Sequence, residues 1–176
     1  MEQVLYIIGQ TLGVLAVILG FVNYQVKSRE HVLYVHIVTA LCFLVHYLLI
    51  GAYSGMAMNV VAAIRDIVYY KAGKNGRVSR VLSVGFMLIM GVMGVLAWEA
   101  WDSIFVIAGL MINSFAMSFI NPNNVRKSIL ISSPMVITYN VFVHSYGGVI
   151  YESIVIVSSV IGLIRFGKNK EQDIKR

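Results

Sequence analysis

The sequence predicts an all-α integral membrane protein with seven transmembrane helices. Of its 176 residues, 59% are hydrophobic and only 12% are charged, and the mean hydropathy is +0.80. Ordinary soluble domains carry about 25% charged residues, so this chain has too few charges to cover a water-facing surface. Long apolar runs recur along the whole sequence, and basic residues gather in alternate breaks between them. Together these observations exclude a soluble fold.

A helix needs about 20 mostly apolar residues to cross the hydrocarbon core of a bilayer. Two glycines and a serine lie between positions 51 and 55, and such a cluster favours a turn over a continuous helix. The apolar segments on either side are therefore counted separately, which gives seven spans instead of six. The predicted spans are 4–22, 32–50, 56–70, 81–98, 104–120, 129–143 and 149–166.

The basic residues predict how the chain is oriented in the membrane. Thirteen of the 14 lysines and arginines follow the first, third, fifth or seventh span, and the loops on the opposite side contain none. Short loops rich in lysine and arginine remain in the cytoplasm. The N-terminus is therefore expected outside and the C-terminus inside. The net charge of +6 then indicates membrane topology and contact with anionic lipid headgroups, and it does not indicate nucleic acid.

Two short sequence matches indicate an internal repeat. Phe21-Val22-Asn23-Tyr24-Gln25 matches Phe119-Ile120-Asn121-Pro122-Asn123 at an offset of 98 residues. Ala52-Tyr53-Ser54-Gly55 matches Ser145-Tyr146-Gly147-Gly148 at an offset of 93. An odd number of spans between two repeats makes them run in the same direction, related by an axis along the membrane normal. The single membrane domain, 1–176, is thus predicted to divide into a three-helix repeat at 4–73, a linker helix at 78–100, a second three-helix repeat at 103–167 and a cytoplasmic tail at 168–176.

This 3+1+3 arrangement resembles the PQ-loop/SWEET (MtN3-like) transporter superfamily, and the whole chain is similar to the YgjV-type bacterial inner-membrane family. The resemblance implies a multi-pass protein of the bacterial inner membrane. The Pro-Gln pair of the superfamily would fall on Tyr24-Gln25 and Pro122-Asn123, so each half keeps one of the two residues. The resemblance also implies that the third and seventh spans contribute polar side chains to a central pocket. The residues it assigns to hinges are Asn23, Gln25, Asn121 and Pro122.

Five polar residues within the spans are candidates for solute binding. Asn113 lies near the middle of the fifth span and Asn59 near the start of the third. An amide offers both donors and an acceptor, so it can recognise a polar solute, although hydrogen bonding between helices is an equally simple role. Tyr47, Tyr139 and Asn140 correspond approximately across the repeat and could form the floor of a pocket.

Four further residues are candidates for charge or coupling. Arg65 and Asp66 are adjacent, so as neighbours on one helix they are not expected to face each other. Arg65 either extends to the membrane surface or forms a structural ion pair, or it binds an anion. Glu152 is expected in the first turn of the last span, near the outer interface, with proton coupling as the alternative. His46 is either a hydrogen-bonded packing residue or part of a proton relay.

The sequence favours a transporter or facilitator that binds a small polar solute near the midplane, in a cavity walled by the first, second, third, fifth, sixth and seventh spans. The alternative is a receptor-like or structural protein of the same fold that does not move its ligand. No phosphate-binding glycine loop, His-Glu-x-x-His motif or Gly-x-Ser-x-Gly motif is present, so neither an enzyme nor a cofactor or metal is expected. The expected partners are membrane lipids and the solute, and a homo-oligomer is left open.

Overall fold

The computed structural model describes residues 2–25, 29–72, 78–119 and 122–174. In this part of the chain the regular secondary structure consists of helices alone, which confirms the all-α class and the seven predicted elements. They are α1 (Glu2–Gln25), α2 (Arg29–Leu49), α3 (Tyr53–Ala72), α4 (Arg80–Leu96), α5 (Ser103–Ala116), α6 (Pro122–Phe142) and α7 (Tyr146–Ile174).

By length and composition alone, one helical segment among the described residues could cross a membrane, Tyr146–Arg165 of α7. Four shorter apolar segments lie within α1, α2, α4 and α5, at Gln3–Leu19, Tyr34–Leu49, Arg80–Leu96 and Ser103–Ala116. Large apolar side chains nevertheless cover the outside of the bundle, as at Val81, Val95 and Leu96, which are 82%, 67% and 76% exposed. A surface of this kind is suited to lipid.

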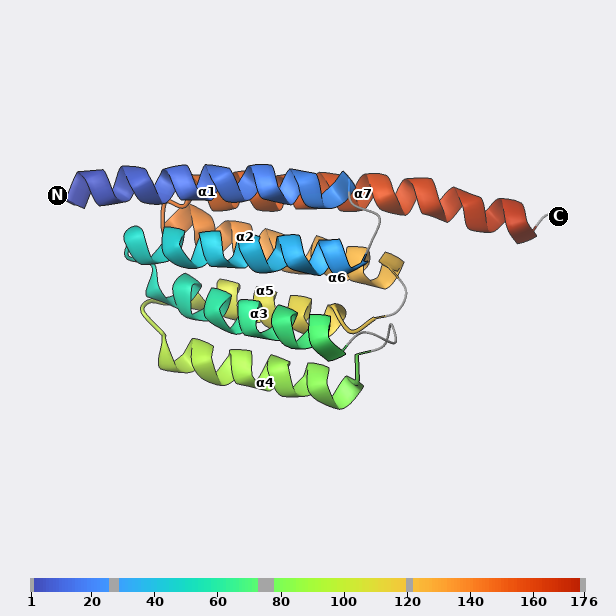
Figure 1. Cartoon of the computed structure of the whole chain (residues 1–176), viewed down its shortest axis with the longest axis horizontal. Helices are drawn as coiled ribbons and strands as arrows, with labels where there is room; N and C mark the ends of the chain where they lie inside the picture. The colour runs from blue at the N-terminus through green and yellow to red at the C-terminus, as the bar shows by residue number, and fades with distance from the viewer. Residues whose placement is uncertain (1, 26–28, 73–77, 120–121, 175–176) are drawn as a thin grey trace.

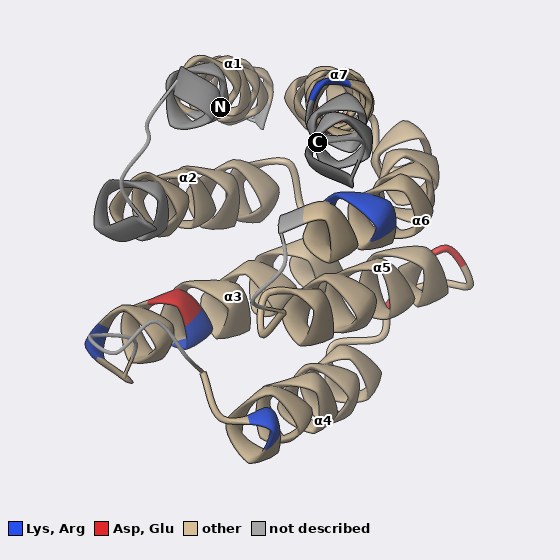
Figure 2. Cartoon of the chain, turned by 90° about the vertical axis from the view of Figure 1, so that its right-hand side faces the viewer, with Lys and Arg blue, Asp and Glu red and all other residues tan. Residues whose placement is uncertain are grey.

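The helices are arranged in two columns with α4 beneath them (Figure 2). One column consists of α1, α2 and α3, and the other of α7, α6 and α5, with each helix packed on the next in its column. The columns meet where α1 contacts α7 and where α3 contacts α5, and α4 packs against α3 and α5. All the helices run roughly along one direction (Figure 1), so the bundle has two ends.

We name the two ends by their charge. The basic end is the one at which α1, α3, α5 and α7 finish, and it faces the viewer in Figure 2. Its basic residues include Lys71, Arg80, Lys127 and Arg165. The acidic end is the opposite one, where α3, α5 and α7 begin and where Glu99 and Asp102 lie between α4 and α5.

Several helices differ in length from their predicted spans. α6 begins at Pro122 instead of 129, and α7 continues to Ile174 instead of ending at 166. Proline is favoured at the first position of a helix, because its missing N–H has no partner there anyway. The apolar run that defines a span measures only the part of a helix that faces hydrocarbon, so a polar extension of the same helix is not counted.

Glycine allows α1 to pack closely on α2 and α7. A Cβ atom on Gly147 would lie 2.6 Å from the carbonyl carbon of Gly13, so the backbones of α1 and α7 touch at this point. A Cβ on Gly9 would lie 3.0 Å from Cβ of Leu49 in α2. The Gly9-x-x-x-Gly13 spacing thus places two small residues at helix contacts, as is common in membrane bundles.

Candidate functional site

A cavity of about 70 Å³ lies between the two columns. A buried water requires about 10–15 Å³ of such space, so the cavity has room for roughly five waters or one small solute. Its lining comes from α2, α3, α5, α6 and α7. None of the described side chains of α1 lines it, in contrast to the expectation that the first span forms part of its wall, and α1 sits at the edge of its column, packed on α2 and α7.

Four of the five predicted solute-binding residues line this cavity. Asn59, Asn113, Tyr47 and Asn140 contribute to its surface from four different helices. Tyr139 does not line it. The Tyr139 hydroxyl instead accepts a hydrogen bond of 2.9 Å from the backbone N–H of Gly55 at the start of α3. Tyr139 therefore faces the start of α3, while Asn140 faces the cavity.

Arg65 and Asp66 form a direct ion pair, contrary to the expectation that neighbours on a helix cannot meet. Both Nε and Nη2 of Arg65 bind Oδ1 of Asp66, at 3.0 and 2.8 Å. The helical period fixes only the direction of each Cα–Cβ bond. The long arginine side chain curls back over the turn and carries its guanidinium to the short aspartate.

Arg65 does not extend to the surface of the bundle. The residue is 2% exposed and Asp66 is 1% exposed, and both line the cavity. Arg65 lies about 18 Å along α3 from the acidic end, at 1.5 Å per residue. The Nη1 nitrogen of Arg65 and the Oδ2 oxygen of Asp66 are buried with no hydrogen-bond partner.

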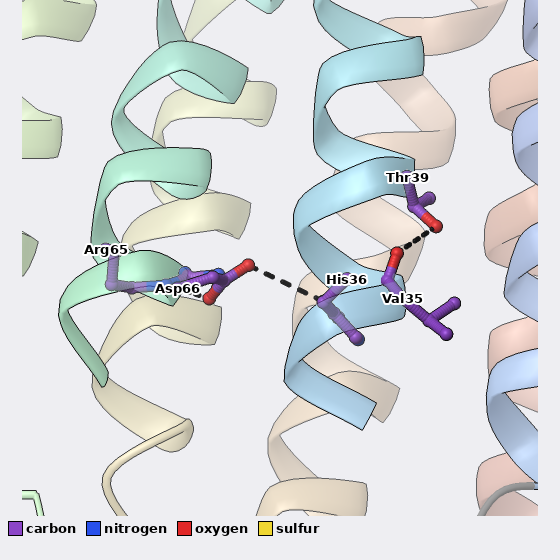
Figure 3. Close-up of polar contacts among 5 residues, drawn as sticks. All are labelled: Val35, His36, Thr39, Arg65 and Asp66. Carbon is purple, nitrogen blue, oxygen red and sulfur yellow. Dashed lines mark hydrogen bonds and ion pairs between the residues drawn. The ribbon is translucent and has the colours of Figure 1, made fainter. Parts of the chain in front are cut away.

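His36 of α2 completes this cluster from the facing helix (Figure 3). Its Nδ1 atom lies 3.8 Å from Oδ2 of Asp66, and its side chain is 27% exposed. A charge-assisted hydrogen bond between such groups is about 2.7–2.9 Å long, so His36 and Asp66 are aligned without being bonded. We call Arg65, Asp66 and His36 the charged triad.

A hydrogen bond between α2 and α6 crosses the end of the cavity that lies closest to the acidic end. The Tyr47 hydroxyl donates to Oδ1 of Asn140 at 2.6 Å, which joins α2 to α6 across the middle of the bundle. Tyr47 is 3% exposed and Asn140 is 1% exposed. The Nδ2 donor of Asn140 is left without a partner, so this amide retains an unused donor at the cavity.

Glu152 also lines the cavity. Because α7 begins at Tyr146 instead of 149, Glu152 falls in the second helical turn instead of the first. Within the described residues, no lysine, arginine or histidine forms an ion pair with Glu152.

His46 lies outside the cavity lining, in a network that ties α2 to α1 and α7. Its Nδ1 is 2.7 Å from the carbonyl oxygen of Gly9 and its Nε2 is 2.7 Å from the Ser145 hydroxyl. A carbonyl can only accept, so Nδ1 carries the proton and the neutral ring accepts from Ser145 through Nε2. Ser145 Oγ in turn accepts from the backbone N–H of Gly148, at 3.3 Å. The fully buried His46 is thus hydrogen-bonded on both sides.

The four hinge candidates lie at the end of α1 and around the start of α6. Asn121 lies outside the described residues. Asn23 and Gln25 belong to the last turn of α1 and Pro122 begins α6, but their side chains are not among those described.

Sequence reasoning missed His36 and Thr39 as parts of the site. Both line the cavity, and the Thr39 hydroxyl donates to the Val35 carbonyl at 2.8 Å (Figure 3). One signal was available. His36 lies a few residues into α2 from the basic end and Asp66 a few residues before α3 finishes there, so antiparallel helices bring them to equal depth.

Comparison with known proteins identifies the family to which the chain belongs. The pattern of Imp-YgjV, described as a bacterial inner membrane protein, matches residues 7–170. The chain belongs to the Imp-YgjV family. No curated protein and no solved structure matches it.

Membership of Imp-YgjV makes this a protein of the bacterial inner membrane. The matched region begins within α1 and ends within α7, so it includes all residues that line the cavity. The polar cavity therefore belongs to the part of the chain that the family pattern matches. Buried ionisable groups are costly within a membrane and usually serve a substrate or ion pathway.

Proposed function

We propose that this Imp-YgjV protein is a transporter or facilitator for a small polar solute, which binds in the central cavity between α1–α3 and α5–α7. The observation that carries the proposal is that polar side chains from both columns converge on one cavity inside the bundle: Asn59, Arg65, Asp66, Asn113, Asn140 and Glu152. A purely structural bundle gains little from such groups, because each hydrogen bond between membrane helices contributes only about 0.6 kcal/mol on average. The protein has no catalytic role in this proposal.

The arrangement of the helices supports a repeat of the 3+1+3 type. Rotation that exchanges α1 with α5, α2 with α6 and α3 with α7 turns the α1–α7 contact into the α5–α3 contact. Tyr47 and Asn140, which are 93 residues apart, bond to each other across the middle. A Cβ on Gly55 would lie 2.9 Å from the Tyr47 ring, and at the same offset a Cβ on Gly148 would lie 2.6 Å from Cγ of Asn140.

These equivalent contacts support two halves that can rock about a fixed central site, as in transporters with parallel repeats. The basic end is the cytoplasmic one in this proposal, because lysine and arginine accumulate in cytoplasmic loops. The Tyr47–Asn140 hydrogen bond then closes the periplasmic side of the cavity.

Cysteine accessibility tests whether the cavity opens to both sides of the membrane. Cys42 is the chain's one cysteine, so Cys42→Ser provides the background for Asn113→Cys in the cavity and for Leu88→Cys as the control. Leu88 is 57% exposed on α4 and is expected to face lipid. An impermeant methanethiosulfonate reagent is applied to right-side-out and to inside-out vesicles.

A transporter predicts modification of Asn113→Cys from both sides, while Leu88→Cys reacts from neither, because a thiol in hydrocarbon does not ionise. Modification of Asn113→Cys from one side only would favour a receptor-like protein. No modification from either side would reject the solute cavity altogether.

A further inference from the structure

We infer that the solute is a small carboxylate, bound through Nη1 of Arg65, and that it enters together with a proton carried by His36. The inference rests on the proposed function and names the chemistry of its central site. It starts from the charged triad, in which two buried polar atoms have no partner.

The donor that would bind the carboxylate is already present and unused. Nε and Nη2 of Arg65 are both occupied by Oδ1 of Asp66. Nη1 has no partner, although it is buried and belongs to a residue that lines the cavity. A buried donor without an acceptor costs about 1–3 kcal/mol, and more when it is charged. Guanidinium and carboxylate are matched in charge and in planar geometry, so a carboxylate is the ligand that removes this cost.

The charge of the triad explains why a proton would accompany the anion. With His36 neutral, Arg65 and Asp66 cancel, and an added carboxylate leaves the site with a net charge of minus one in a region of low dielectric. With His36 protonated, its positive charge faces Oδ2 of Asp66 across 3.8 Å. The four charges, two positive and two negative, then sum to zero.

The same geometry provides a mechanism for coupling. Protonated His36 and Asp66 need to approach by about 1 Å to form a charge-assisted hydrogen bond. That contact takes part of the negative charge of Asp66 away from Arg65, so the guanidinium attracts an anion at its unused Nη1 more strongly. His36 has the most exposed side chain of the triad, at 27%, while Arg65 and Asp66 are buried, so we assign His36 as the group that takes up the proton.

Other ionisable groups around the cavity do not offer a second binding site for the carboxylate. Arg65 and Asp66 are the charged residues that face His36 from α3, and the described side chains of α1 carry no charge. Glu152 of α7, with Tyr47 of α2 and Tyr151 of α7, also lines the cavity, and a second carboxylate would oppose an anion beside it. We therefore assign the carboxylate to the Arg65 side of the cavity.

The size of the cavity restricts the ligand to a few non-hydrogen atoms. Its volume of about 70 Å³ corresponds to roughly five waters. Glycolate, with five non-hydrogen atoms, is a probe of suitable size, and glycolamide is its uncharged counterpart.

The test measures uptake of radiolabelled glycolate and of glycolamide into proteoliposomes that contain a pH-sensitive dye. For the unmodified protein we expect glycolate uptake with acidification of the lumen, and faster uptake as the external pH falls from about 8 to 5, the range in which histidine gains its proton. Lys71→Gln, which removes an exposed cation from the end of α3, is the matched control and should behave as the unmodified protein.

Four variants separate the roles within the triad. Arg65→Gln should lower glycolate uptake about tenfold or more, the equivalent of one charge-assisted hydrogen bond. Arg65→Gln/Asp66→Asn should be equally poor although it leaves no unpaired buried charge, which separates ligand binding from folding. Asp66→Asn should retain glycolate uptake without acidification, because Arg65 is then free at every pH. His36→Gln should show slow uptake that no longer responds to pH.

Glycolate uptake in Arg65→Gln/Asp66→Asn equal to that of the unmodified protein would overturn the assignment to Arg65. Uptake without acidification in the unmodified protein would overturn the role of His36. If glycolate does not enter while Asn113→Cys reacts from both sides, the carboxylate inference fails and the proposed transporter stands. If Asn113→Cys reacts from neither side, both fail together.

Discussion

At the scale of single residues, the ion pair between Arg65 and Asp66 shows what a sequence can and cannot predict. Their position within an apolar run left two readings for Arg65, extension to the membrane surface or a buried ion pair, and the structure shows the buried pair. That they bond to each other could not be predicted, because helical periodicity fixes the direction of Cβ and not the end of a long side chain. Likewise, Tyr47 and Asn140 could be paired from the repeat, but their hydrogen bond required the packing of α2 near α6.

The pair predicts a strongly non-additive effect on stability. Arg65→Gln leaves Asp66 as an uncompensated buried charge and should destabilise the protein by about 3–5 kcal/mol. Arg65→Gln/Asp66→Asn removes both charges and should recover most of that loss. Equilibrium unfolding in mixed micelles measures the free energies of unfolding. Simple addition of the two single effects would show that the pair is not coupled.

The Tyr47–Asn140 hydrogen bond predicts a smaller effect. Tyr47→Phe removes the donor to Oδ1 of Asn140, and we expect a destabilisation of about 0.6 kcal/mol, with about 1.7 as the upper limit for membrane helices. Tyr70→Phe is the control, since Tyr70 is 44% exposed near the end of α3. Equal changes in the two variants, measured by the same unfolding method, would contradict a specific role for this bond.

At the scale of helices, sequence patterns predicted which segments are helical better than where they end. Apolar runs identify all seven helices, because lipid requires an apolar surface. The beginning of α6 was missed because Asn123 and Asn124 follow Pro122 in the same helix without being apolar. The earlier start of α7 places Glu152 in the second helical turn instead of the first, and there it lines the cavity.

The contact between α1 and α7 predicts different effects of alanine at different glycines. Gly147→Ala should separate the two helices, because the new Cβ would lie 2.6 Å from the carbonyl carbon of Gly13. Gly85→Ala in α4 meets nothing within 4 Å and should stabilise the helix by about 0.5–1 kcal/mol. Thermal unfolding in detergent compares the two variants. An equal loss of stability in Gly85→Ala and Gly147→Ala would show that the effect of Gly147→Ala does not come from the close contact between α1 and α7.

At the scale of the whole molecule, the charge distribution of the sequence predicts an orientation that can be tested on described residues. In a Cys42→Ser background, Trp101→Cys at the acidic end and Arg80→Cys at the basic end both place a thiol at exposed positions. An impermeant maleimide added to right-side-out spheroplasts should label Trp101→Cys and not Arg80→Cys. The reverse pattern would invert the proposed topology and would place the Tyr47–Asn140 closure on the cytoplasmic side.

The contact between α1 and α7, which joins the two columns, has a consequence for biosynthesis. The Gly9 carbonyl binds His46, which also binds Ser145, and Nε2 of Gln10 donates to the His144 carbonyl at 2.8 Å. Because α1 precedes α7 in the chain, α1 leaves the ribosome before the helix it packs against has been made. Until α7 arrives, the glycine face of α1 and its polar neighbours are open to lipid or to other membrane proteins. A chain interrupted before α7 would retain this exposed face, a feature by which membrane quality control can recognise unfinished copies.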